Sequence, residues 1–281
     1  MNGFAWAAFA VNLAWSAAAA LGVMLITFAI AVRKGMHRVV DVAWGLAFTA
    51  VAVVTFLASA DTGDPGRRLL VTVLTALWGV RLAAHIARRG RGRGHGHGRG
   101  HGHGHGRGHG EDPRYEALLS KAPGSRNMYA LRIVYLLQGL LVWLVSLPVQ
   151  AAQYISGPMT VVAAAGACLW AVGMFFETIG DAQLARFKTD PANKGRIMDR
   201  GLWRYTRHPN YFGDFCVWWG LFLITCDSLA AAAVGVVSPV VMSLLLTKGS
   251  GKRLLEQHMA ERPGFDEYAE RTSGFFPLPP R

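Results

Sequence analysis

Apolar blocks, most of them about as long as a membrane-spanning helix, recur along this 281-residue chain. A helix needs roughly 20 apolar residues to cross about 30 Å of hydrocarbon. The first block is longer than the apolar core of a signal peptide, lacks a basic start and is followed by others like it. The expected spans are residues 4–32, 39–59, 68–87, 129–150, 158–185, 212–226 and 229–247. The sequence therefore predicts an all-α fold, a polytopic membrane helix bundle of about seven transmembrane helices.

Positive charge gathers in alternate connections between these blocks. Lys and Arg number three in residues 33–38, nine in 88–128, seven in 186–211 and six in the tail 248–281. Because basic residues favour the cytoplasmic side, we expect the N-terminus outside and the C-terminus in the cytoplasm, in a multi-pass protein of the inner (cytoplasmic) membrane. A net charge of +12 suggests nucleic acid on a soluble protein. Here it flanks apolar helices, so no nucleic-acid partner is expected.

A strict dipeptide run in residues 89–110 separates two parts of the chain, 1–88 with three spans and 111–281 with four. Every even position of the run is Gly and every odd one is Arg or His, with six histidines. Each Gly costs a helix about 1 kcal/mol relative to Ala, so we expect a disordered cytoplasmic loop. A repeat-expanded linker is the first interpretation, and loose binding of metal or lipid headgroups is the alternative. The three cysteines form no CxxC pair, and no metal centre is expected.

Three ionisable residues in the first spans are candidate catalytic groups, because charged side chains are costly in a bilayer and usually functional there. Asp41 lies near the cytoplasmic start of the second span, while Arg81 and His85 lie four residues apart on the third. Residues at that spacing share one helical face. Each also has a structural interpretation: Asp41 as a helix cap, and Arg81 with His85 as side chains that reach toward the headgroups.

Two carboxylates, Glu177 and Asp181, lie one turn apart on the fifth span, near its cytoplasmic end. Like charges at that spacing repel each other, so the pair needs cationic partners or hydroxyl donors. The nearby cations are Arg186, Lys188 and Arg196, and a ribose of a bound nucleotide would serve equally.

The fourteen residues from Gly201 to Asp214, Gly-Leu-Trp-Arg-Tyr-Thr-Arg-His-Pro-Asn-Tyr-Phe-Gly-Asp, concentrate polar chemistry at a membrane edge. Two arginines can clamp phosphates, the N-terminus of the next helix offers N–H donors, and the rings provide a stacking surface. An interfacial aromatic belt is an alternative for the aromatics and arginines, but it does not explain Asn210 and Asp214, which share a helical face. The candidates are Arg204, Tyr205, Arg207, His208, Asn210, Tyr211 and Asp214. They suit a dinucleotide that enters from the cytoplasm, without the glycine fingerprint of a Rossmann domain.

These same residues carry a resemblance to a known family. The 201–214 segment resembles the C-terminal signature of the steroid 5α-reductase and sterol reductase superfamily, and the whole chain resembles its bacterial DUF1295 group. The further matching stretches are Asp41-Val-Ala-Trp-Gly, Gly110-Glu-Asp-Pro-Arg-Tyr, Glu177-Thr-Ile-Gly-Asp-Ala-Gln, and the tail from Leu254-Leu-Glu through Pro263-Gly-Phe-Asp-Glu-Tyr to Phe276-Pro.

The resemblance implies a seven-helix bundle that binds NADPH and reduces a carbon–carbon double bond in a lipid or steroid-like enone that enters from the bilayer. It places Asp181, Lys188, Arg196, Asn210 and Asp214 in the cofactor pocket. The chain departs from the steroid enzymes in two respects. Asp214 stands where they usually have Glu, and their catalytic Glu and Tyr are replaced by Asp41 and, at the Tyr position, by Trp78.

Two other functions remain open from the sequence. Isoprenylcysteine-type membrane methyltransferases, which bind S-adenosylmethionine, also carry an Arg-His-Pro-x-Tyr-x-Gly stretch before a membrane helix. A non-catalytic lipid-binding protein on the same fold is the third interpretation, since a fold does not determine function. Asn210 and the Glu177–Asp181 helix favour the reductase.

Overall fold

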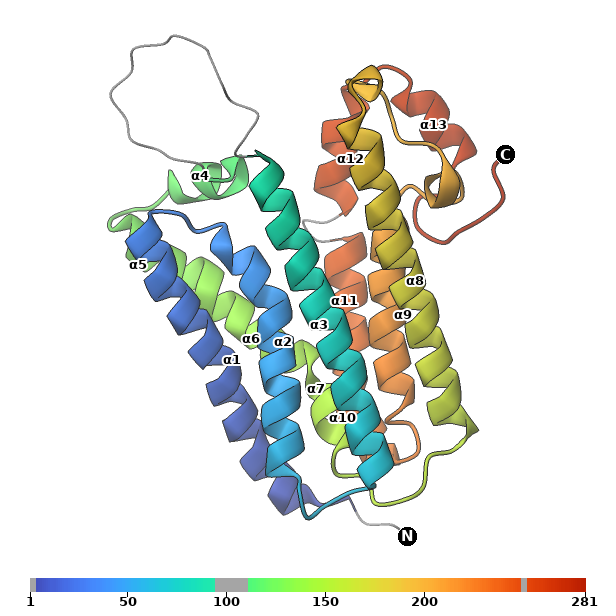
Figure 1. Cartoon of the computed structure of the whole chain (residues 1–281). Coiled ribbons are helices and arrows are strands. Elements are labelled where there is room, and N and C mark those ends of the chain that lie inside the picture. The colour runs from blue at the N-terminus through green and yellow to red at the C-terminus, as the bar shows by residue number, and fades with distance from the viewer. Residues whose placement is uncertain (1–3, 94–110, 249–251) are drawn as a thin grey trace. The chain divides into compact units, whose positions relative to one another are not determined.

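The computed structural model describes residues 4–93, 111–248 and 252–281, and this part of the chain is helical or irregular apart from one isolated β-bridge between Thr206 and Ser273 (Figure 1). The chain forms two compact units, Met1–Gly157 and Pro158–Arg281. The division expected from composition grouped residues 111–281 together, whereas here α4 to α7 belong to the first unit, because α6 and α7 pack against α1, α2 and α3.

The first unit is built on three long helices that follow one another and pack in order. Its helices are α1 Trp6–Lys34, α2 Val39–Ala58, α3 Pro65–Arg93, α4 Pro113–Leu119, α5 Arg126–Ala130, a π-helical segment Leu131–Leu136, α6 Leu137–Val145 and α7 Leu147–Ala152. In Figure 1, α2 lies between α1 and α3. Gly45 and Gly79 bring the α2 and α3 backbones into direct contact, and a Cβ on either glycine would collide with the other's carbonyl.

A buried amide fastens the α7 end of the first unit to α1. The Gln150 side chain donates to the Ser146 hydroxyl at 2.8 Å and to the Trp143 carbonyl at 3.1 Å, and its oxygen accepts from Ser16 at 2.7 Å. All of Gln150, Ser16 and Ser146 are fully buried. Because lipid cannot replace lost hydrogen bonds, such polar contacts hold membrane helices in register.

The second unit is organised around one antiparallel helix pair. Its elements are α8 Val161–Thr189, 3₁₀ turns Pro191–Asn193 and Gly201–Arg204, α9 Pro209–Leu223, α10 Leu229–Gly235, α11 Val237–Thr247, α12 Lys252–Ala260 and α13 Phe265–Arg271. Glycines one heptad apart on α8 meet glycines on α9: Gly166 lies against Gly220, and Gly173 lies against Gly213. A Cβ on any of these four would come within 2.5–2.6 Å of a backbone oxygen of the other helix. The two backbones are therefore as close as helices can pack.

Six helical segments of the described residues are long and apolar enough to cross a membrane. They correspond to all the expected spans except 212–226, which is α9. With 15 residues, α9 is about 22 Å long, which is shorter than about 30 Å of hydrocarbon. The all-α multi-pass membrane fold is thus confirmed, while the orientation and the choice of membrane stay predictions. Helix α3 continues into the first residues of the Arg/His-Gly run, and residues 94–110 lie outside the described part.

We expect Gly213→Ala to destabilise the protein by roughly 1–3 kcal/mol, the usual cost of overpacking, because the new methyl would lie 2.6 Å from the Gly173 oxygen. Thermal unfolding in detergent would measure the change. Gly22→Ala on α1 is the control, since a Cβ there meets nothing within 4 Å and Ala favours the helix. Equal melting temperatures for Gly213→Ala and the wild type would contradict the close approach.

Candidate functional site

The signature segment 201–214 connects α8 to α9 and is tied to α8. The Gln183 side chain accepts a hydrogen bond from the Leu202 N–H at 2.9 Å, and the Trp203 indole donates to the Gly180 carbonyl at 3.0 Å. Gly201 has φ +61° and lies against the Gln183 side chain, where a Cβ would collide. Pro209 occupies the first turn of α9, where a missing N–H costs nothing. Local sequence therefore sets where this loop ends and the helix begins.

The C-terminal tail holds the other side of the same segment. Thr206 donates to the Phe275 carbonyl at 2.8 Å, and Tyr268 donates to the Trp203 carbonyl at 2.6 Å. Arg207 donates through Nη1 to the carbonyls of Ala269 and Thr272, both at 2.8 Å. The tail thus forms part of the site. Arg207 was expected to clamp a phosphate, but its Nη1 donates to the tail.

Glu256 of α12 connects two of the predicted site residues. Its Oε1 accepts from Arg207 Nε and lies 3.0 Å from His208 Nε2. The His208 ring is buried and stacks on Tyr211, with ring centroids 5.2 Å apart and planes 7° from parallel. The structure therefore brings Arg207 and His208 together through Glu256, which was noted in the sequence only within the matching Leu254-Leu-Glu stretch.

The connection between α8 and α9 is strongly cationic and exposed. Its two carboxylates are used locally: Asp190 caps the Pro191–Asn193 turn, accepting from the Ala192 N–H at 2.9 Å, and Asp199 pairs with Arg271 at 2.6 Å. Four of its basic side chains, Lys194, Arg196, Arg200 and Arg204, are exposed, as are Arg186 and Lys188 on the last turn of α8 just before it. Tyr205, beside them, is also 43% exposed. The charge balance of this segment favours an anionic ligand or anionic headgroups.

The two predicted carboxylates of α8 lie differently. Glu177 is buried, and a Cβ on Gly213 would fall 2.7 Å from its Cγ, so it lies in the α8–α9 seam. Asp181, one turn further, is half-buried. Asn210 and Asp214 are half-buried on the first turns of α9, and Asp214 accepts from the Trp218 indole at 3.1 Å. Helix α8 therefore carries a buried acid, Glu177, and two exposed bases, Arg186 and Lys188, in its last turn.

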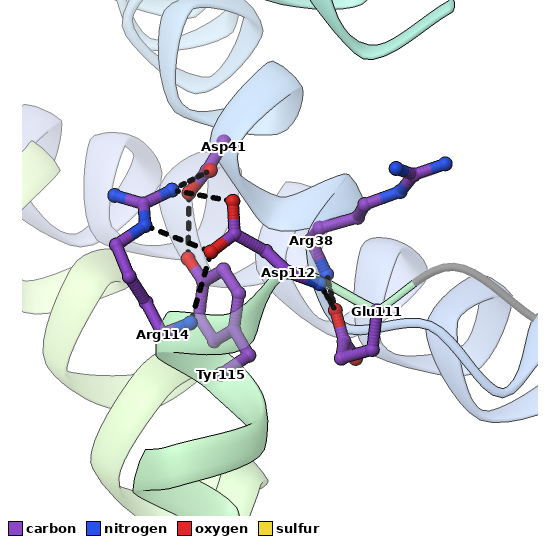
Figure 2. Close-up of polar contacts among 6 residues, drawn as sticks. All are labelled: Arg38, Asp41, Glu111, Asp112, Arg114 and Tyr115. Atoms are coloured by element: carbon purple, nitrogen blue, oxygen red, sulfur yellow. Dashed lines mark hydrogen bonds and ion pairs between the residues drawn. The ribbon is translucent and has the colours of Figure 1, made fainter. Parts of the chain in front are cut away.

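In the first unit, Asp41 is the centre of a polar cluster (Figure 2). Its two carboxylate oxygens accept from the Tyr115 hydroxyl at 2.6 Å and from Arg114 Nη2 at 3.0 Å. Arg114 also pairs with Asp112, with its Nε 3.0 Å from Oδ1. Burial, followed by the charge of Asp41, raises the pKa of the Tyr115 phenol well above its usual value, so this hydroxyl keeps its proton at neutral pH.

The N–H groups just before α2 are bound by Glu111, and Asp41 lies within the first turn of that helix. The Glu111 carboxylate accepts the N–H groups of His37, Arg38 and Asp112. The Gly110-Glu-Asp-Pro-Arg-Tyr stretch was noted in the sequence only as a matching motif, and that match is the signal that could have pointed to Arg114 and Tyr115. Arg81 and His85 are half-buried on α3, and their catalytic role stays a prediction.

A pH dependence follows from His37, which is buried beside this cluster. Burial lowers its pKa below 6.5, outweighing the opposing effects of Glu111 and Asn127, and Arg126 acts in the same direction as burial. The unfolded chain therefore binds more protons just below pH 6.5, and stability is lost as the pH falls through that window, by at most about 1.4 kcal/mol per pH unit.

Thermal unfolding of the full-length protein between pH 7 and 5 tests this, with His37→Gln as the matched variant. The variant should lose part of the decline, because glutamine does not titrate. An identical pH profile in both proteins would contradict the assignment.

Comparison with known proteins gives a family and one distant relative. The model of a family described as "Protein of unknown function (DUF1295)" matches residues 27–99 and 100–272, which cover most of the chain. A curated protein of Ustilaginoidea virens, "Probable O-methyltransferase ustE", is 27% identical over 114 residues, which are 41% of this chain and 35% of that protein. No solved structure matches significantly. The chain therefore belongs to the DUF1295 family.

Proposed function

We propose that this protein is a membrane-embedded, NADPH-dependent reductase of a carbon–carbon double bond in a lipid or steroid-like enone. The observation that carries the proposal is the exposed cationic segment between α8 and α9, whose own carboxylates are already used in a cap and an ion pair. Guanidiniums bind phosphates, as they bind carboxylates, often through two parallel hydrogen bonds.

The residues present fit an anionic dinucleotide. Arg196 and Arg204 are exposed cations on the connecting segment, and Asn210 and Asp214 are half-buried hydrogen-bonding groups on the adjoining turns of α9. Bound NADPH would supply the hydride for the reduction. The chain's part is to bind the phosphates, orient the ring and exclude water with the apolar walls of its helices.

The reduction also needs a proton at the enolate oxygen or the α-carbon. We expect it from the Asp41 cluster, where the Tyr115 hydroxyl joins Asp41 as a candidate. The phenol is protonated at neutral pH and donates its single proton to Asp41 at 2.6 Å, so in the proposed step this proton passes from the phenol to the substrate and water afterwards returns a proton to the phenolate. Arg114 and Tyr115 both donate to the Asp41 carboxylate, so Asp41 can also hold the phenol in place.

The second candidate is an S-adenosylmethionine-dependent methyltransferase, and the observation that favours it is the name of the relative from Ustilaginoidea virens. The charge of the site argues against it. S-adenosylmethionine carries a sulfonium cation, an α-amino group and a single carboxylate but no phosphate, so it offers the exposed bases Arg196 and Arg204 fewer anionic groups than NADPH does.

Titration of the purified full-length protein separates the two. We expect saturable binding of NADPH, weakened by added salt, and none of S-adenosylmethionine. Arg196→Gln and Arg204→Gln should each raise the Kd for NADPH about tenfold, since hydrogen bonds to charged groups are the stronger ones. Arg262→Gln, an exposed cation of the tail, is the charge-matched control. Binding of S-adenosylmethionine in place of NADPH would establish the methyltransferase.

Turnover is tested separately with NADPH and a panel of enone lipids, by following NADPH oxidation and the gain of two hydrogens in the lipid by mass spectrometry. Tyr115→Phe should lower turnover by about 100-fold or more, in the range of general acid–base effects, while the Kd for NADPH is unchanged. A Tyr115→Phe protein with wild-type turnover would remove the phenol from the mechanism.

A further inference from the structure

Glu256 is the one point among the described contacts where a tail side chain meets two side chains of the signature at once. Its Oε1 is 3.0 Å from Arg207 Nε and 3.0 Å from His208 Nε2. The three side chains are largely enclosed, with 25%, 15% and 3% of their surfaces exposed for Glu256, Arg207 and His208. A carboxylate that accepts two donors in an enclosed place restricts the rotamers of both partners.

The charge of Glu256 is part of this arrangement. Burial acts to raise the pKa of its carboxyl, but the hydrogen bonds and charges of Arg207 and His208 lower it below its ordinary value. Glu256 is therefore ionised at neutral pH, and its contacts to Arg207 and His208 are charge-assisted.

The other hydrogen bonds named above between the tail and the signature are of a different kind, because each ends on a backbone atom. Tyr268 donates to the Trp203 carbonyl and Thr206 donates to the Phe275 carbonyl. These hydrogen bonds hold the tail against the loop but do not orient a signature side chain toward a ligand. The Glu256 contacts do: they fix the ring plane of His208 and, together with the hydrogen bonds from Arg207 Nη1 to two tail carbonyls, the guanidinium plane of Arg207.

The His208 ring passes this orientation on to Tyr211, on which it stacks. His208 directly precedes α9, and Tyr211 is on the first turn of that helix. One carboxylate therefore fixes a guanidinium and a pair of parallel rings at the start of α9. A guanidinium beside flat rings is suited to a nucleotide, in which a ribose joins a phosphate to an aromatic base.

We propose that Glu256 is a positioning residue for the nucleotide site, which pre-organises Arg207, His208 and Tyr211 before an anionic nucleotide binds. The inference rests on the proposed function, because the nucleotide it invokes is NADPH. Side chains that are ordered before binding lose less freedom when the ligand arrives, and affinity is gained for that reason.

The test compares the Kd for NADPH of the full-length protein in detergent with those of three variants. Glu256→Gln keeps the shape and removes the charge, and we expect its Kd to rise about tenfold. Glu256→Asp keeps the charge and should recover most of the affinity. Tyr268→Phe removes a tail–loop hydrogen bond of 2.6 Å without touching Arg207 or His208, so its Kd should change by less than about threefold.

The outcomes separate the possible failures. Equal losses in Glu256→Gln and Tyr268→Phe would show that Glu256 only docks the tail, and would overturn the inference. So would a Glu256→Gln protein with wild-type affinity, or a Glu256→Asp protein as weak as Glu256→Gln. Absence of saturable NADPH binding by the wild-type protein would instead overturn the proposed function, and the inference with it.

Discussion

The direct contact between the α8 and α9 backbones is the constraint on which the second unit depends. In lipid, apolar side chains gain little by leaving their surroundings, so helices associate through close packing and hydrogen bonds. Gly166, Gly173, Gly213 and Gly220 permit that packing because they have no Cβ. The same seam brings the buried Glu177 against Gly213, so the element that holds the helices together also positions an acidic group of the candidate site.

The polar ends of the two units share a principle of construction. In each, one carboxylate accepts hydrogen bonds from two side chains of a distant segment: Asp41 from Arg114 and Tyr115, and Glu256 from Arg207 and His208. Such a contact orients both donors, and the negative charge of the carboxylate strengthens both hydrogen bonds. The exposed bases Arg196 and Arg204 give the connection between α8 and α9 a positive charge, which suits a ligand or lipid headgroups of opposite charge.

The sequence predicted where the helices lie better than it predicted which residues the candidate side chains contact. The apolar blocks located the long helices, and only α9 is shorter than a span requires. The signature residues His208 and Tyr211 were chosen as cofactor ligands, which stays a prediction, and in the structure their rings stack on each other. Arg207 was chosen as a phosphate clamp, and the structure shows most of its donors engaged with Glu256 and two tail carbonyls. Residue types alone cannot show that the donors of a candidate side chain already make hydrogen bonds within the protein.

The sequence by itself determined the all-α membrane fold, the DUF1295 membership and the location of charge along the chain, because apolar length and residue type are local properties. Only the tertiary structure decided which charges meet. Asp41 lies 73 and 74 residues from Arg114 and Tyr115, and Glu256 lies 49 and 48 residues from Arg207 and His208. No periodicity reaches across such separations, since contacts of this kind depend on how helices pack and where loops return.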